Sequence, residues 1–228
     1  MKIRILQLLK GAETAAGVTV IIDVFRAFTL EAFLADRGAR AILPVADIGR
    51  AYAMKQADPE VILIGERHGR KCEGFDFGNS PSEIEEIDFT GRTVVHTTSA
   101  GTQGIAAARK ADVILTGSLV NARAVAEYIR SLDPEEVSLV CMGWEAKEET
   151  EEDTLCAGYI RSLLLGEPFD LASGIENLKL TSGAKFFDKA KNDVFPERDF
   201  TLCTDADRFG FVLRVEKSPD GSFHIVKV

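Results

Sequence analysis

The stretch Val18–Ala35, VTVIIDVFRAFTLEAFLA, contains the pattern that decides the fold. It begins with an unbroken apolar and β-branched run, Val18–Ile22, which is typical of a strand buried on both faces. After Val24 the apolar residues recur at helical spacing, at Phe25, Phe28, Ala32 and Phe33. A strand followed directly by a helix is the repeating unit of proteins with a parallel sheet.

The same unit recurs along the chain. Strand-like runs lie at residues 41–45, 61–64, 93–97, 113–116 and 137–142, and helical patterns lie at 48–57, 102–110, 121–132 and 154–165. This alternation predicts the α/β class, with a mostly parallel sheet between two layers of helices in a three-layer α/β/α arrangement.

The last third of the chain reads differently. Residues 168–192 suggest helices and loops, whereas Phe211–Glu216 and Phe223–Val228 flank the turn Ser218–Gly221 and predict a C-terminal β-hairpin. The pattern leaves open whether this hairpin extends the sheet or forms an appendage. No linker rich in Pro, Gly or Ser interrupts the chain, so we expect residues 1–228 to form one domain.

Composition limits the classes of function. With 228 residues, 46% of them hydrophobic, the chain is long enough to bury a sizeable core. The net charge of −9 argues against a general nucleic-acid binder. Acidic residues outnumber basic ones strongly over residues 81–170, whereas the two are balanced over residues 1–80. We therefore expect the N-terminal third to bind a small anionic ligand.

Cysteine usage and hydropathy indicate a cytoplasmic protein. The four cysteines are widely spaced and form no CxxC pair, which is typical of reduced thiols. No apolar run approaches the ~18 residues of a membrane-spanning helix, and no signal peptide is visible. We expect no membrane partner, and the sequence leaves homo-oligomerisation open.

Polar and glycine residues follow nearly every predicted strand. Ligands of open α/β sheets bind beyond the carboxyl ends of the strands, so these residues are the candidates for a site. They are Asp23 and Arg26, Glu66 with the loop behind it, Thr97–Thr102, Gly117-Ser118 with Asn121, and the acidic run Glu145–Asp153.

The loop Arg67–Ser80 is unusually long and rich in functional groups. Arg67, Arg70 and Lys71 supply cationic donors that suit phosphate or sulfonate. Asp76 stands between Phe75 and Phe77, which we expect to anchor the loop and to hold Asp76 as a metal ligand or base. Loops of this length in compact domains are usually functional or disordered.

Each group also has a purely structural interpretation. Asp23 can cap the helix that follows it, and Thr97–Thr102 can be an ordinary hydroxyl-rich cap. Glu145–Glu151 is typical of a solvated helix start, with Thr150 and Asp153 in a capping box. Glu152 and Asp153 are better placed to bind a hard cation through oxygen.

Several familiar motifs are missing. The chain has no phosphate-binding P-loop, no GxGxxG after a strand, no GxSxG elbow and no complete set of zinc ligands. The remaining set of carboxylates, cations and glycine-rich turns suits metal-assisted chemistry on an anion.

A series of short motifs is similar to those of a known family. They are Asp23–Ala27 (DVFRA), Gly65–Lys71 (GERHGRK), Gly74–Pro81 (GFDFGNSP), Thr97–Thr102, Gly117-Ser118 with Asn121-Ala122, and Glu152-Asp153 before Cys156–Gly158. In this order they resemble the 2-phosphosulfolactate phosphatase family. The chain departs from the family pattern at Phe28, His68 and Ser99-Ala100.

The resemblance implies an enzyme, a Mg²⁺-dependent phosphatase that converts 2-phospho-3-sulfolactate to 3-sulfolactate and phosphate, as in coenzyme M biosynthesis. Catalytic roles are expected for Asp23, Glu66 and Asp76, and the expected metal ligands are Asp23, Asp76, Glu152 and Asp153. The expected substrate-binding residues are Arg26, Arg67, Arg70, Lys71, Thr98, Gly101, Thr102, Ser118 and Asn121. The alternatives are a phosphatase of another small phosphorylated acid and a non-catalytic anion-binding protein.

Overall fold

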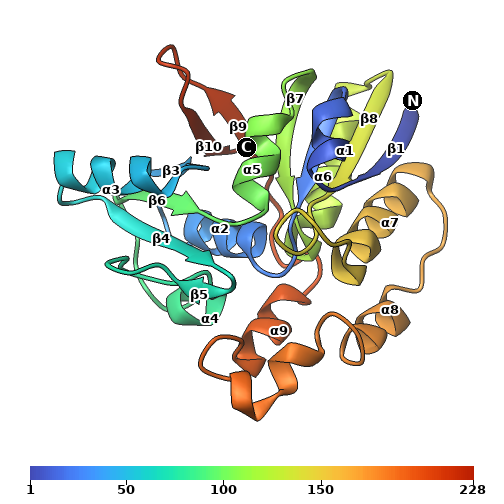
Figure 1. Cartoon of the computed structure of the whole chain (residues 1–228). Coiled ribbons are helices and arrows are strands. Elements are labelled where there is room, and N and C mark those ends of the chain that lie inside the picture. Colours follow the sequence, from blue (N-terminus) through green and yellow to red (C-terminus); the bar gives the residue numbers. More distant parts are fainter.

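A computed structural model describes all residues, 1–228, and confirms the α/β class. One sheet of ten strands has helices around it (Figure 1). The strands are β1 (Lys2–Gln7), β2 (Gly17–Ile22), β3 (Ala41–Pro44), β4 (Ile62–Arg67), β5 (Arg70–Lys71), β6 (Thr93–Thr97), β7 (Ala111–Gly117), β8 (Glu136–Cys141), β9 (Leu213–Lys217) and β10 (Phe223–Lys227). The α-helices are α1 (Leu8–Thr14), α2 (Ala27–Asp36), α3 (Ile48–Ala57), α4 (Pro81–Ile84), α5 (Gly101–Ala107), α6 (Ala122–Leu132), α7 (Glu151–Leu165), α8 (Leu171–Leu178) and α9 (Glu197–Cys203). Short 3-10 turns are η1 (Leu119–Asn121), η2 (Ala184–Phe187) and η3 (Lys189–Lys191).

The sheet consists of two parallel groups joined by the C-terminal hairpin. The strand order is β1-β8-β2-β7-β9-β10-β3-β6-β4-β5. The first four strands are mutually parallel, as are β3, β6 and β4, whereas β9 and β10 pair antiparallel to their neighbours. In Figure 1 the two groups run at an angle to each other, with the hairpin between them.

The hairpin therefore lies in the middle of the sheet, a position that the sequence did not indicate. β9 is in register with β7 through Ile114 and Val215, and β10 meets β3 at one bridge, between Ile225 and Ile42. Hydrophobic alternation predicts that a strand exists but not which strand it pairs with. The last two strands of the chain thus join two groups of strands that come from earlier parts of the sequence.

Alternation along β2 explains the three layers. Val18, Val20 and Ile22 pack into a core with α6 and α7, whereas Ile21 packs on the opposite face against α1 and α5. Successive side chains of a strand point to opposite faces, so a continuous apolar run requires cover on both. No helix of the structure is both long enough and apolar enough to span a membrane.

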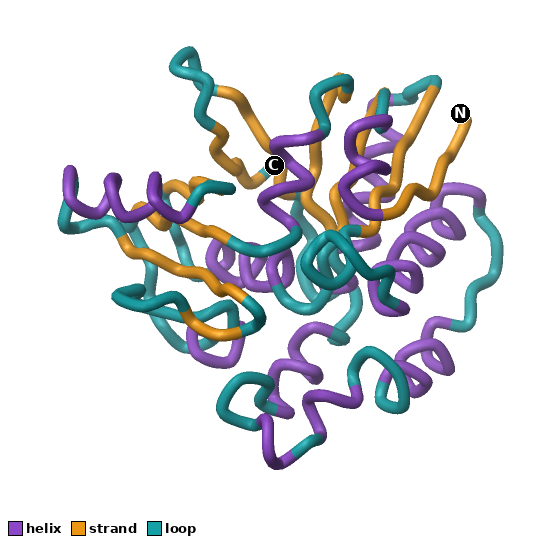
Figure 2. Tube along the Cα trace, viewed as in Figure 1, coloured by secondary structure: helices purple, strands orange, loops and turns teal.

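The segment between α7 and β9 crosses back over the end of the sheet. Figure 2 shows it as short helices and loops along the lower side of the molecule. The Asp207 N–H donates to the Leu119 carbonyl (3.0 Å), and the Phe209 N–H donates to the Val120 carbonyl (2.8 Å). These bonds attach the segment to η1, beside the carboxyl ends of β2 and β7.

We predict that the contact between β10 and β3 contributes substantially to the free energy of unfolding. Ile225 is 5% exposed, and Ile225→Ala is expected to lower the free energy of unfolding by about 2–4 kcal/mol in urea denaturation, because it opens a cavity at the junction. The control Val228→Ala, at a position 47% exposed, should change it by less than about 0.5 kcal/mol. Equal losses of unfolding free energy in the two variants would contradict a particular contribution of the contact between β10 and β3.

Candidate active site

The turn after β6 brings two carboxylates from different strands together. Glu66, at the end of β4, accepts the Ser99 N–H at 2.7 Å, and Asp23, at the end of β2, accepts the Gly101 N–H at 3.1 Å. A Cβ at Gly101 would lie 3.0 Å from Asp23 Oδ2 and 2.8 Å from the Phe28 ring. Glycine at this position therefore allows the close approach of Asp23, and the carboxyl ends of the two strand groups meet here as the sequence predicts.

Asp153 links the end of β2 to the loop after β8. Its two carboxylate oxygens accept the Val24 N–H and the Gly143 N–H, both at 2.8 Å. The capping box expected with Thr150 is absent, because Thr150 makes no side-chain cap. Asp153 is 2% exposed, and each of its oxygens already has a backbone donor.

Glu152 is buried beside these groups and lacks a full set of partners. It is 3% exposed, and its Oε2 has no hydrogen-bond donor. Burial, together with repulsion from Glu66 and Glu152, raises the pKa of Asp23 from 3.8 to about 7. Burial and the same kind of repulsion raise the pKa of Asp153 well above its ordinary value. Such a cluster favours the binding of a proton or a cation.

Two hollows lie near this cluster; Asp23 and Glu66 line the first, whereas Glu152 and Asp153 line neither. A narrow cavity of about 30 Å³ is lined by Asp23, Glu66 and Ser99, which leaves room for little more than a water molecule or an ion. A groove of about 540 Å³ adjoins it. The two hollows share Arg26, Gly69 and Asn79 as lining residues.

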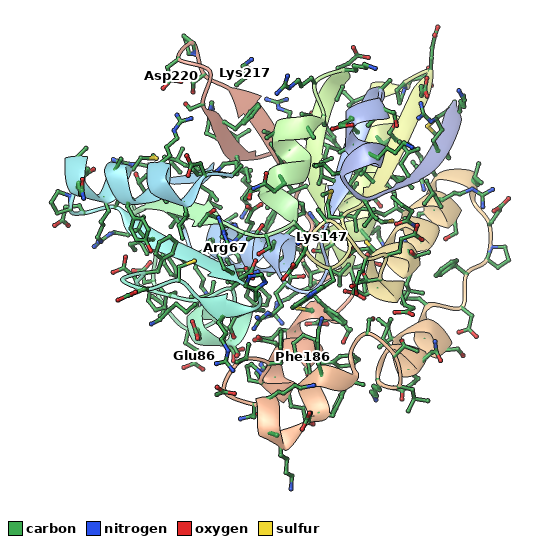
Figure 3. The ribbon with its side chains drawn as sticks, viewed as in Figure 1. Arg67, Glu86, Lys147, Phe186, Lys217 and Asp220 are labelled. Carbon is green, nitrogen blue, oxygen red and sulfur yellow. The ribbon has the colours of Figure 1, made fainter.

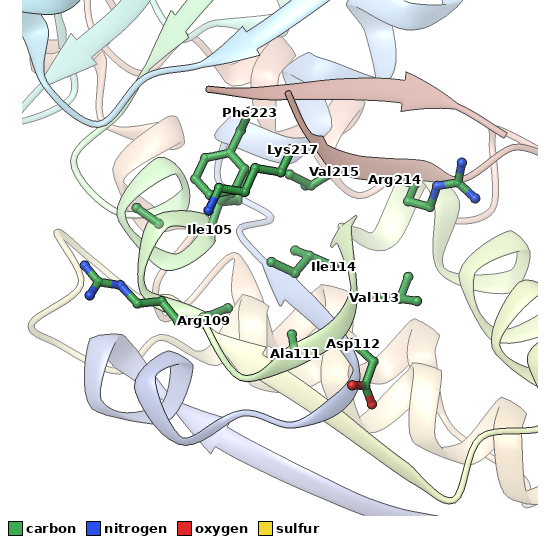
Figure 4. A pocket seen from close by; sticks show the side chains of 12 residues that line it. Ile105, Arg109, Ala111, Asp112, Val113, Ile114, Arg214, Val215, Lys217 and Phe223 are labelled. Carbon is green, nitrogen blue, oxygen red and sulfur yellow. The ribbon is translucent and has the colours of Figure 1, made fainter. Parts of the chain in front are cut away.

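A third hollow, of about 560 Å³, lies elsewhere, between α5, β7 and the hairpin (Figure 4). Its lining is mostly apolar, and Figure 4 shows Arg109, Asp112 and Arg214 pointing away from its centre. It contains one carboxylate and no group of polar side chains that converge. The first two hollows, unlike this one, are lined mostly by polar and charged residues and by glycine, so they are the candidates for the active site.

Arg26 lines both hollows and also holds separate segments of the chain together. Its guanidinium donates to Asp199 Oδ2 (2.9 Å), to the Val194 carbonyl (2.8 Å) and to the Gly69 carbonyl (3.1 Å). Arg26 and Asp199 are both buried, so this ion pair holds the returning C-terminal segment against the loop after β4. The predicted anion-binding role of Arg26 remains a prediction, because three of its donors already have partners.

The basic residues of the loop after β4 do not all face the same way. Arg70 and Lys71 line the groove, and Arg70 pairs there with Asp193 at 3.3 Å. Arg67 instead donates to Thr97 Oγ1 (2.9 Å) and lines neither the narrow cavity nor the groove. Arg67 and Glu66 are neighbours on a strand, so their side chains point to opposite faces.

Asp76 does not belong to the site, which corrects the expectation that it is catalytic and binds metal. It accepts the Leu63 N–H (2.8 Å) and Lys55 Nζ (3.2 Å), and its side chain is 39% exposed. Phe75 does anchor the loop, as a buried core residue, and Phe77 packs beside another part of the core. The anchored loop, however, runs back along β4 and carries Asp76 toward the start of that strand.

The other predicted substrate-binding residues form hydrogen bonds within the protein. Thr98 and Thr102 bond each other, with the Thr98 N–H 3.3 Å from Thr102 Oγ1, and begin α5. The Asn121 side chain accepts the Ser118 N–H at 3.1 Å. None of these four lines the narrow cavity or the groove, so their expected contacts with substrate do not fit this arrangement. The returning C-terminal segment covers η1, which a local motif cannot reveal.

Two unexpected pairs involve the histidines that the sequence left without a role. His68 has a φ of +56° and pairs through Nδ1 with Glu145, which lines the narrow cavity. His96 is fully buried between Glu31 Oε1 (2.8 Å from Nδ1) and Asn79 Oδ1 (3.2 Å from Nε2). His96 thus holds the amide of Asn79, which lines both hollows.

A lysine that no sequence motif indicated packs on aromatic residues of the narrow cavity. Lys185, from η2, lies 4.6 Å from the centre of the Trp144 ring and 5.4 Å from that of Phe195. Figure 3 labels Phe186 in this segment, Lys147 in the loop after β8 and Arg67 at the end of β4; these three segments surround the site. A single lysine in an irregular segment has no motif, so only the tertiary structure places it here.

Comparison with known proteins identifies the family of this chain. The family model described as 2-phosphosulpholactate phosphatase matches residues 3–218. A probable 2-phosphosulfolactate phosphatase of Caldicellulosiruptor saccharolyticus is 39% identical over 178 residues, which cover 76% of this chain and 72% of the relative. Proteins of the same description from Prochlorococcus marinus (strain MIT 9303) and Bacillus subtilis are 32% and 28% identical, over 89% of this chain and 90% and 88% of the relatives.

We predict that the stability of the metal-free protein falls as the pH rises from about 4 to about 7. The raised pKa of Asp23 means that the folded state keeps a proton that the unfolded state has lost over this range. The slope from this group is at most about 1.4 kcal/mol per pH unit. Urea denaturation in EDTA at several pH values should show a flatter dependence for Asp23→Asn and an unchanged one for the exposed control Asp112→Asn. The same slope in wild type and Asp23→Asn would contradict the raised pKa.

Proposed function

Because the chain belongs to the 2-phosphosulpholactate phosphatase family, we propose that it hydrolyses 2-phospho-3-sulfolactate to 3-sulfolactate and phosphate with Mg²⁺ as its cofactor. The observation that carries the proposal is a narrow cavity lined by the buried carboxylates Asp23 and Glu66, which adjoins a groove with cationic lining. The cluster suits the reacting phosphoryl group with a metal, and the groove suits the rest of a small polyanion.

The carboxylates suit a hard divalent cation such as Mg²⁺. The donors are all oxygen, whereas no His or Cys joins them. Glu152 has an oxygen without a donor, and burial with repulsion keeps the pKa of Asp23 high. No three acidic, His or Cys side chains are grouped closely enough to form a complete cage. Mg²⁺ usually uses one or two carboxylates and takes its other ligands from water and substrate phosphate.

Asp23 and Glu152 are therefore the proposed metal ligands. Asp23 accepts the Ala27 and Gly101 N–H groups at 3.2 and 3.1 Å. Asp153 accepts two shorter bonds, both 2.8 Å, from Val24 and Gly143, so its proposed role is to hold β2 and the loop after β8 at the right separation. Glu66, which accepts the N–H groups of Ser99 and Gly69, fixes the loops on either side of the cavity. When bound, Mg²⁺ would neutralise charge on the phosphoryl oxygens and orient them.

The groove is proposed to bind the carboxylate and sulfonate of the substrate. Arg70 and Lys71 bring two cationic side chains, both exposed and free to move toward an anion. The amide of Asn79 reaches both hollows, and its Oδ1 is held by His96 Nε2. The Nδ2 of Asn79 is then the atom that remains to donate to a substrate oxygen.

The leading alternative is a phosphatase of another small phosphorylated acid. His68, one of the departures from the family pattern, pairs with Glu145 beside the narrow cavity. A panel of phosphorylated hydroxy acids compared by kcat/KM separates the two possibilities. A non-catalytic anion receptor is disfavoured, because buried carboxylates repel an anion unless a cation is also bound.

We predict phosphate release from 2-phosphosulfolactate that stops in EDTA and returns with Mg²⁺. Glu152→Gln should lower kcat by about 100-fold or more, since it removes a metal ligand while keeping the shape of the side chain. Asp76→Asn should stay within about twofold of wild type, because the Asp76 carboxylate is bound to the Leu63 N–H and Lys55 Nζ at the start of β4, away from Asp23 and Glu66.

No phosphate release from this ester by folded protein in Mg²⁺ would refute the proposed substrate. Full activity in EDTA would refute the metal requirement, and a large loss in Asp76→Asn with none in Glu152→Gln would refute the assignment of the site.

A further inference from the structure

Lys185 is a cation without an ionic partner in the carboxylate-rich part of the protein. Its Nζ lies within cation–π range of four rings, and no carboxylate or carbonyl oxygen lies within ion-pair or hydrogen-bond distance. The distances to the ring centres are 4.6 Å for Trp144, 5.4 Å for Phe195, 5.6 Å for Phe186 and 5.8 Å for Phe25. Trp144, Phe195 and Phe25 also line the narrow cavity.

The surroundings of Lys185 act on its charge in opposite directions. Burial lowers the pKa of Lys185 below its ordinary value of 10.5, and the positive charge of Arg26 lowers it further. The carboxylates of Glu152, Asp23 and Asp153 oppose this change. An ammonium whose pKa is lowered releases its proton more readily than that of an exposed lysine.

We propose that Lys185 is the general acid that protonates the leaving oxygen of the substrate. The proposal rests on the proposed phosphatase activity and supplies the one group that the carboxylate cluster does not provide. The leaving group is an alkoxide of a secondary alcohol, which is a strong base and departs poorly without a proton. Lys185 itself lines neither hollow, but three of the rings around its ammonium line the narrow cavity. The rings leave the ammonium without an oxygen acceptor that would compete for its proton.

The proton balance closes without another reactant. The attacking water forms a new P–O bond while the bond from phosphorus to the C2 oxygen breaks, and its electron pair stays on that oxygen. The Lys185 ammonium gives this oxygen a proton, so 3-sulfolactate leaves as an alcohol. The attacking water loses one proton to solvent, and the Lys185 amine regains one from solvent. The sum is phosphate ester plus water to alcohol plus phosphate.

Two other roles would give Lys185 the same location. The ammonium could serve as a cation–π brace for the aromatic cluster, or as a fixed positive charge that binds the phosphate. Arginine fulfils both of these roles, since it stacks on rings and keeps its charge, but it does not release a proton at accessible pH. Lys185→Arg and Lys185→Met together therefore separate proton transfer from charge and packing.

Steady-state kinetics on 2-phosphosulfolactate with Mg²⁺ provide the first test. Lys185→Met and Lys185→Arg should each lose about 100-fold or more in kcat with a much smaller change in KM, and both should lose the decrease of kcat at alkaline pH. The control Lys189→Met, in the exposed turn η3, should stay within about twofold. Activity of Lys185→Arg within about tenfold of wild type would overturn the proposal, because charge would then suffice.

Dependence on the leaving group sharpens this test. 4-Nitrophenyl phosphate releases a phenolate that needs no proton, so the loss in Lys185→Met should be under about tenfold on this ester. Equal losses on both esters would overturn proton transfer. If wild type hydrolyses 4-nitrophenyl phosphate but not 2-phosphosulfolactate, the proposed substrate fails and the role of Lys185 is judged on the remaining esters of the panel.

A test that does not depend on catalysis measures the fluorescence of the single tryptophan. The chain contains one Trp, Trp144, and it is the ring nearest to Lys185 Nζ. Deprotonation of Lys185 should change its fluorescence in a step centred below pH 10.5 in metal-free wild type, and this step should be absent in Lys185→Met and in Lys185→Arg. A wild-type step centred at or above pH 10.5, or the same step in both variants, would overturn the proposal. Far-UV circular dichroism of each variant shows that it is folded.

Discussion

The buried ion pair between Arg26 and Asp199 is the contact on which the geometry of the site depends. Arg26 follows β2, and Asp199 lies in α9, so the pair joins the first strand–helix unit to a segment more than 170 residues later. The remaining carboxylate oxygen of Asp199 accepts Ser80 Oγ (2.7 Å) and the Ser82 N–H (3.0 Å). Loss of one partner would leave an uncompensated buried charge, which is strongly destabilising.

This single junction determines where the other groups lie. Because Arg26 also donates to the carbonyls of Val194 and Gly69, the loop after β4 and the returning segment stay on either side of the cavity. Strand ends and backbone N–H groups bring the carboxylates of Asp23 and Glu66 together, and the first turn of α7 adds the buried carboxylate of Glu152. Their mutual repulsion makes the site unfavourable on its own and suited to a divalent cation or a protonated lysine.

Much of the fold could be predicted from the sequence, since a continuous apolar run followed by a helical pattern depends on local spacing alone. Asp23 and Glu66 could be selected as candidates because strand ends of a parallel sheet carry ligands, and their roles remain predictions. β1 was missed, because it is an edge strand whose mixed exposure breaks the apolar pattern. Lys185 and the central hairpin could not be predicted, since both depend on how the last third of the chain crosses the rest. The expectation for Asp76 was wrong because the flanking phenylalanines indicate that the loop is anchored, but not toward which end of β4 the loop runs.

The most direct measurement of the central claim is anomalous diffraction from crystals soaked in Mn²⁺, which takes the same oxygen ligands as Mg²⁺. The proposed site predicts one strong peak at the junction of the two strand groups, within about 2.0–2.3 Å of carboxylate oxygens of Asp23 and Glu152. The peak should be absent in crystals of Glu152→Gln soaked in the same way. A peak at Asp76, or none at the junction, would contradict the assignment of the metal site.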